Sequence, residues 1–165
     1  MTANMTFENE ARIGAFLKFS DWRAPLKSTL GRISRRCQLS STDIRALVDH
    51  YIDTYNRKNI DDILMSVHPQ VEFKNIYAGV VNASTNAVTE LRTLAQQSLS
   101  LFSEQHQKIE LFELQGSVAV AMIAFRAGVA ADLPNGMKKG KVLNFSGRSE
   151  FEFQDGAVSK ITDFS

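Results

Sequence analysis

The sequence has a single cysteine, Cys37, among its 165 residues, so no disulfide can form within the chain. A lone cysteine is typical of a reducing compartment, and we expect a cytoplasmic protein. The 19 basic and 18 acidic residues leave a formal net charge of +1, which gives no overall field to attract nucleic acid. No apolar run approaches the ~20 residues that cross a bilayer. We therefore expect neither a nucleic-acid partner nor a transmembrane segment.

Spacings typical of metal ligands are also missing from the sequence. The three histidines, His50, His68 and His106, form neither an HxH nor an HExxH pattern, and no cysteine stands beside them. The sequence therefore predicts no metal site.

The composition changes near residue 40. Between Asp21 and Asp43 the chain has five basic residues and no acidic one, and its apolar residues follow a roughly helical spacing that Pro25 and Gly31 interrupt. One interpretation is a basic amphipathic segment that contacts a membrane surface, an acidic partner or RNA. The other, which we favour, is a loosely ordered and solvated extension. We accordingly divide the chain into an N-terminal extension, residues 1–40, and one domain, residues 41–165.

The domain begins with a strong helix signal. Ser40 and Asp43 have the spacing of a capping box. Apolar residues then recur at helical intervals from Ile44 to Tyr55, which predicts an amphipathic helix with one buried face.

Two further helices are expected before the chain turns to strands. Asn59 can cap a short second helix that Pro69 ends. Ser84 or Thr85 can cap a longer third helix, whose apolar positions run to Phe102.

After the third helix the sequence predicts strands alone: KIELFEL, SVAVAMIAFRAGVA, KVLNFSGRSEFEF and AVSKITDF. Helices followed by an antiparallel meander indicate the α+β class. We expect a curved antiparallel sheet that forms a cone, with the three helices packed on its concave face. Such a cone can enclose a cavity.

The third of these strands places a polar residue on its apolar face. Phe145, Ser149 and Phe151 share one face of the strand, and the next strand adds Asp163. A lone buried carboxylate costs several kcal/mol. Asp163 must therefore be paired, protonated or exposed at the strand end. Arg126 can pair with it and keep it ionised, whereas an apolar site would raise its pKa and favour acid–base chemistry.

The region from Thr42 to Ser165 resembles the nuclear-transport-factor-two-like (NTF2-like) superfold, especially its SnoaL-like branch of small bacterial proteins. The matching features are the first helix ending YNRKNIDDI, the aromatic VEFKN strand and the closing FEFQDGAVSKITDF hairpin. The resemblance implies the cone, a small-molecule cavity and a homodimer, which is common in this superfold. The superfold hosts isomerases, cyclases, epoxide hydrolases, dehydratases and non-catalytic binding domains, so the fold does not settle the activity.

Ketosteroid isomerases of this superfold match in part. They use a tyrosine and a protonated carboxyl as an oxyanion hole, with a second carboxylate as the base. The resemblance places the tyrosine at Tyr51, the base at Asn75 and the protonated carboxyl at Ser149. Because an amide cannot accept a proton at neutral pH, steroid-type proton shuttling at these positions is excluded.

The limonene-epoxide hydrolase branch gives a different partial match. The resemblance places its water-holding asparagine at Asn75, its water-activating aspartate at Asp163 and its arginine at Arg126. Its tyrosine has become Phe73, and its second acid has become Gly128. Losing that acid removes the group that protonates the opening epoxide oxygen, which speaks against full hydrolase activity.

These observations lead to two main hypotheses about function. The first is a cofactor-independent cyclase, isomerase or hydrolase acting on an apolar ketone- or epoxide-bearing compound. The second is a non-catalytic ligand-binding or dimeric interaction module, in which side chains can fill the cavity. For the first, we expect Asp163, Tyr51 and Asn75 to be catalytic. The expected ligand-binding residues are Phe73, Tyr77, Met122, Arg126, Phe145 and Ser149.

Overall fold

The computed structural model describes residues 39–134 and 136–164, so nearly all of the predicted extension, residues 1–40, lies outside the described residues. The α+β class is confirmed. No helix in the described ranges is long and apolar enough to cross a membrane. The elements, in chain order, are α2 (Ser41–Asn56), α3 (Ile60–Met65), β1 (Val67–Tyr77), β2 (Val80–Thr85), α4 (Val88–Ser100), β3 (Phe102–Gln115), β4 (Val118–Val129), β5 (Val142–Gln154) and β6 (Ala157–Phe164).

Helix α2 begins where the sequence predicts. The Ser40 hydroxyl accepts a hydrogen bond from the Asp43 backbone N–H at 3.1 Å, and the Asp43 carboxylate accepts one from the Ser40 backbone N–H at 3.1 Å. Both arms of the capping box are therefore present. The predicted apolar stripe is buried at Val48, Tyr51 and Ile52, which face the sheet.

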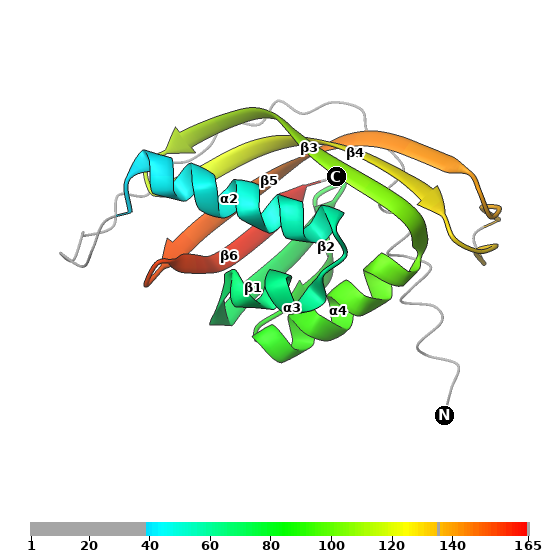
Figure 1. The fold of residues 1–165 in the computed structure, drawn as a ribbon, viewed down its shortest axis with the longest axis horizontal. Helices are drawn as coiled ribbons and strands as arrows, with labels where there is room; N and C mark the ends of the chain where they lie inside the picture. The colour runs from blue at the N-terminus through cyan, green and yellow to red at the C-terminus, as the bar shows by residue number, and fades with distance from the viewer. Residues whose placement is uncertain (1–38, 135, 165) are drawn as a thin grey trace.

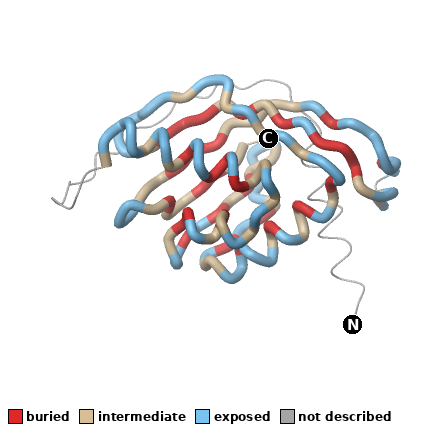
Figure 2. The backbone as a smooth tube through the Cα atoms, viewed as in Figure 1, coloured by how far each residue is buried: buried red, intermediate tan, exposed pale blue. Residues whose placement is uncertain are grey.

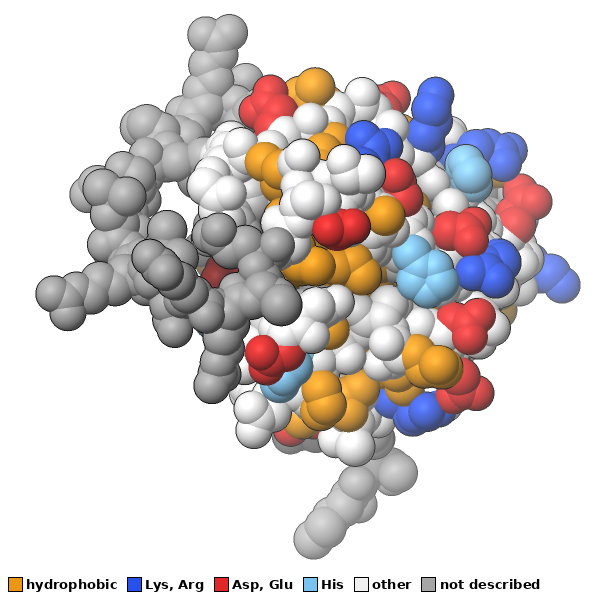
Figure 3. Space-filling model, turned by 60° about the vertical axis from the view of Figure 1, so that its left-hand side comes forward, with side chains coloured by type: hydrophobic (Ala, Val, Ile, Leu, Met, Phe, Trp, Pro, Cys, Tyr) orange, Lys and Arg blue, Asp and Glu red, His pale blue; other side chains and the backbone are white. Residues whose placement is uncertain are grey.

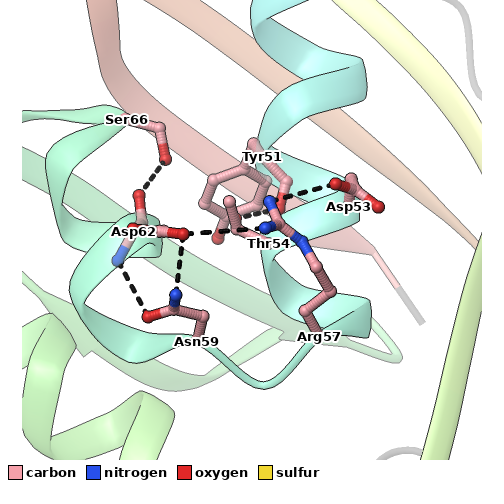
Figure 4. Close-up of polar contacts among 7 residues, drawn as sticks. All are labelled: Tyr51, Asp53, Thr54, Arg57, Asn59, Asp62 and Ser66. Atoms are coloured by element: carbon pink, nitrogen blue, oxygen red, sulfur yellow. Dashed lines mark hydrogen bonds and ion pairs between the residues drawn. The ribbon is translucent and has the colours of Figure 1, made fainter.

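Polar contacts hold the turn between α2 and α3 (Figure 4). Arg57 at the end of α2 forms an ion pair with Asp62 of α3 at 3.8 Å. Asn59 caps α3 as predicted, because its side chain accepts from the Asp62 backbone N–H at 3.3 Å. Buried Thr54 donates to the Tyr51 carbonyl at 2.7 Å. These contacts fix the last turn of α2, next to Tyr51.

Helix α4 begins later than predicted. Its N-cap is Ala87 rather than Ser84 or Thr85, and Ala87 makes no side-chain capping hydrogen bond. Thr85 is instead the last residue of β2. The Glu90 carboxylate accepts a hydrogen bond from the Asn86 backbone N–H at 2.8 Å, which ties the incoming chain to the first turn of the helix.

The six strands form one sheet in the order β2-β1-β6-β5-β4-β3. Strands β3 to β6 form the predicted antiparallel meander. Strand β1, however, pairs with β6 in parallel, with Phe73 beside Ile161, so the sheet is mixed rather than wholly antiparallel. This pairing joins strands far apart in sequence, so local turn residues cannot predict it. The sheet stays open, with β2 and β3 as its edges.

The sheet curves around the three described helices, α2, α3 and α4, which all lie on its concave side (Figure 1). Buried residues follow this arrangement, and Figure 2 shows them along the strands and the helix faces. They form two apolar clusters. The larger lies beneath α2 and α3 and includes Ile63, Val71 and Phe151. The smaller includes Phe102 and Phe125, where β3 and β4 run past the end of α4.

The convex face of the sheet carries charged side chains in pairs. On β5, Arg148 and Glu150 point away from the helices and form an ion pair at 2.9 Å. The Arg148 guanidinium also lies 4.1 Å from the centre of the Phe164 ring. The face of the molecule seen in Figure 3 likewise mixes acidic and basic side chains instead of gathering one sign. This distribution matches the net charge of +1.

Candidate functional site

A cavity of about 140 Å³ lies between the sheet and the helices, and both apolar clusters contribute to its wall. A space of this size has room for several water molecules. Aromatic rings dominate the wall: Tyr51, Tyr55, Phe73, Phe102, Phe125, Phe145 and Phe151.

Three neighbouring strands build the polar part of the wall. Asp163 of β6 is paired in register with Ser149 of β5 on one side and with Asn75 of β1 on the other. Residues paired across strands point to the same face of a sheet, and all three side chains line the cavity. The Ser149 hydroxyl donates a hydrogen bond to Asp163 Oδ1 at 2.6 Å. The carboxyl group is thus held in place by a direct contact.

Helix α2 adds two phenol groups to this part of the wall. Tyr51 and Tyr55 are four residues apart and therefore share one helix face, with their ring centres 5.4 Å apart. The two phenol groups are close enough that each affects the pKa of the other. The Tyr51 ring also packs edge-on against Phe151, at 5.8 Å between ring centres.

The surroundings shift the protonation of these groups. Burial raises the pKa of Asp163 to about 6, and the hydrogen bond from Ser149 opposes part of the rise. Burial also raises the pKa of both Tyr51 and Tyr55, and the nearby Asp163 carboxylate raises each further. At neutral pH the two phenols are therefore protonated donors, whereas Asp163 is mostly ionised and close to its pKa. This arrangement sets a base beside proton donors.

The structure brings together six of the nine predicted site residues. The cavity is lined by Tyr51, Phe73, Asn75, Phe145, Ser149 and Asp163. Tyr77 is not among the lining residues, although it continues the alternation of Phe73 and Asn75. It is the last residue of β1, beyond a shift in the β1–β2 register that follows Asn75.

Strand β4 faces the other way from the prediction. Ile123 and Phe125 line the cavity, whereas Met122 and Arg126 point to the convex face. Because β4 is apolar on both faces, its sequence does not reveal which set of residues turns inward. The pairing of Phe125 with Phe145 decides it, since Phe145 lies on the cavity face.

The proposed pairing of Arg126 with Asp163 is consequently wrong. Arg126 is exposed and forms an ion pair with Glu104 of β3 at 3.3 Å. Asp163 is bonded to Ser149 instead.

Sequence reasoning missed several polar residues of the wall. It included Tyr55 only in the apolar stripe of α2, although the spacing of four residues from Tyr51 could have marked it as a second phenol of the site. It did not single out Gln105 and Gln107, which alternate along β3 and turn inward. The Gln105 side chain donates to the Tyr55 backbone carbonyl at 2.9 Å and so ties β3 to α2.

Within the described residues, no group of three or more His, Cys, Asp or Glu side chains is placed to hold a metal ion.

No family model and no curated protein matches the chain. Solved structures do match. TsrD from Streptomyces laurentii gives a TM-score of 0.62 at 16% identity, over 76% of this chain and 90% of that one. An LEH-like epoxide hydrolase from M. tuberculosis gives 0.58 at 13% identity, over 74% and 82%. An NTF2-like protein of unknown function from Burkholderia pseudomallei gives 0.60 at 14% identity, over 75% and 90%.

The chain has the NTF2-like fold. At these identities the likeness concerns the fold alone, as a further match makes plain. A de novo designed protein with a curved β-sheet gives a TM-score of 0.56 at 13% identity, over 76% of this chain and 87% of that one. The activity of an NTF2-like chain has to be argued from its own cavity.

Proposed function

We propose that the protein binds a small, mostly apolar molecule in the cavity and acts on it without a cofactor. The reaction is of the cyclase, isomerase or hydrolase type, and the compound carries a ketone or an epoxide. The observation that supports this most directly is Asp163. Its carboxyl group is partly buried with a pKa raised to about 6, accepts a hydrogen bond from Ser149 and lies near two phenols.

In this proposal each polar group of the wall has a separate role. Asp163 takes a proton from carbon or from a water molecule, which a carboxylate with a pKa near neutrality does well. Tyr51 and Asn75 donate hydrogen bonds to the ligand oxygen that gains negative charge. Phe73 and Phe145 hold the apolar part of the ligand.

A second candidate is ligand binding without catalysis. The resemblance to ketosteroid isomerases places Asn75 and Ser149 at the positions of their two carboxyl groups, and the described cavity wall has one carboxylate, Asp163. The resemblance to limonene-epoxide hydrolases places their arginine at Arg126 and their second acid at Gly128, but Arg126 is on the convex face and Gly128 bears no side chain. These differences favour isomerisation or cyclisation over hydrolysis.

We further propose that the protein forms a homodimer through the convex face of the sheet. The described helices all lie on the opposite face (Figure 1), and the convex face exposes Leu111 and Val142. Light scattering coupled to gel filtration tests this, with a Leu111→Glu variant expected to shift a dimer to a monomer. A wild-type monomer at micromolar concentration would contradict it.

Activity is tested with Asp163→Asn against a matched control, Asp155→Asn, which changes an exposed acid in the β5–β6 turn. Styrene oxide and 3-cyclohexenone serve as simple epoxide and ketone probes. We expect wild type and Asp155→Asn to turn over at least one of them, and Asp163→Asn to lose turnover while it keeps the wild-type circular dichroism spectrum.

Two other results would change the assignment. Full turnover by Asp163→Asn would remove Asp163 from the mechanism. Saturable binding of the probes without any turnover by wild type would favour the non-catalytic candidate.

A further inference from the structure

The cavity wall is unbalanced in charge. Among the described residues that line it, Asp163 is the one charged side chain, and no lysine, arginine or histidine accompanies it. The remaining polar side chains are hydroxyls and amides, and seven aromatic rings make up much of the rest. The wall therefore presents one negative charge in largely aromatic surroundings.

The carboxylates on the convex face of the sheet are in a different situation. Glu150 is paired with Arg148 at 2.9 Å, and Glu152 is paired with Lys160 at 2.8 Å. None of the ion pairs formed between described residues includes Asp163. Ser149 gives it a hydrogen bond but no positive charge. A cation that enters the cavity and lies within about 4–6 Å of this partly buried carboxyl group favours its charged form.

Aromatic rings are favourable neighbours for such a cation. The faces of phenylalanine and tyrosine rings carry partial negative charge and attract ammonium groups. An anionic ligand, by contrast, would meet the Asp163 carboxylate and find no basic side chain among the described lining residues. The charge and the ring content of the wall thus point to the same ligand chemistry.

We propose that the ligand of this cavity carries an organic ammonium group, a protonated or quaternary amine, that pairs with Asp163 while its apolar part lies among the aromatic rings. This inference rests on the proposed function only in that the cavity is the ligand site. Beyond the proposed function, this inference specifies that the ligand carries a positive charge. The ammonium group would lower the pKa of Asp163 and so hold its carboxyl group in the ionised form.

The test uses the full chain and two probes of nearly the same shape, phenyltrimethylammonium and tert-butylbenzene. They differ in the charge of one central atom. Binding is followed by shifts of the aromatic side-chain resonances in NMR titrations near pH 7.5, where Asp163 is ionised. We expect the cation to bind at least about tenfold more tightly than the neutral probe. In Asp163→Asn this preference should fall to about threefold or less, whereas Asp155→Asn should keep it.

The outcomes separate this inference from the proposed function. If both probes bind wild type equally, or if Asp163→Asn keeps the preference for the cation, the ammonium inference is overturned and small-molecule binding stands. If neither probe shifts a cavity resonance, both are overturned. Tight binding of 4-tert-butylbenzoate, an anion of similar shape, would also contradict the ammonium inference alone.

Discussion

The two faces of the sheet differ in how their poorly exposed charged side chains are paired. On the convex face, the Arg148 and Glu150 side chains are only 16% and 20% exposed, and each charge meets its opposite at 2.9 Å. On the concave face, Asp163 has hydroxyl groups around it and no described basic side chain in the cavity wall. The charged side chains of the convex face are therefore paired with one another. The concave face leaves a carboxyl group whose protonation and partner depend on what enters the cavity.

The largest expected effect is the loss of stability on removing the ring of Phe151, a buried aromatic residue on the concave face. Phe151 is 1% exposed and packs against Tyr51, so Phe151→Ala should lower the free energy of unfolding by about 3–5 kcal/mol. The control on the convex face is its neighbour, Glu152→Ala. That residue is half-exposed and takes part in a surface ion pair, so the loss should stay below about 1 kcal/mol. Urea unfolding followed by circular dichroism measures both, and equal losses would contradict the assignment of the two faces.

The second effect depends on pH. The pKa of Asp163 rises from an ordinary 3.8 to about 6 on folding, so between these values the folded protein binds more protons than the unfolded chain. Wild-type stability should therefore fall as pH rises from 4 to 7, by on the order of 2–3 kcal/mol from this one group. Asp163→Asn lacks this contribution, so the stability difference between the two proteins should shift in favour of the variant over that range. A difference that stays constant with pH would contradict the burial of the carboxyl group.

A smaller effect is expected on the convex face. Arg148→Ala removes the partner of the poorly exposed Glu150 and the contact with the Phe164 ring, so it should lower the free energy of unfolding by about 1–2 kcal/mol. The double variant with Glu150→Gln should recover part of the loss, because the unpaired charge is then gone. Additive losses measured by urea unfolding would show that the two side chains do not act as a pair.

The smallest expected effect is a further rise in the pKa of Asp163. Ser149→Ala removes the hydrogen bond that holds down the pKa of Asp163, so that pKa should move further upward. Ser146→Ala changes a serine of the same strand that points to the convex face, and it should leave the pKa unchanged. Carboxyl resonances in carbon-13 NMR follow this proton, and equal shifts in the two variants would count against the Ser149 contact.

Much of the fold could be predicted from local patterns. The capping box at Ser40, the stripe of α2 and the alternation from Phe145 to Phe153 each depend on residues close together in sequence, and each has its predicted counterpart in the structure. The parallel pairing of β1 with β6 could not be predicted in this way. It depends on contacts between distant segments that no turn residue specifies.

The site was predictable to a similar extent. Period two placed Phe73 with Asn75, and Ser149 with Phe151, because each of these strands has one apolar face. Along β4 the alternation does not identify the inward face, because both faces are apolar. Only the register with β5 determines which residues turn inward.

The central claim is that the Asp163 carboxyl group is enclosed by the cavity. A pH titration of the Asp163 side-chain carboxyl carbon by NMR, assigned with Asp163→Asn, tests it most directly. We expect a midpoint at about pH 6 in the protein without added ligand. A midpoint near the ordinary value of 3.8 would show that the group lies in water, and it would contradict both the proposed chemistry and the ammonium site.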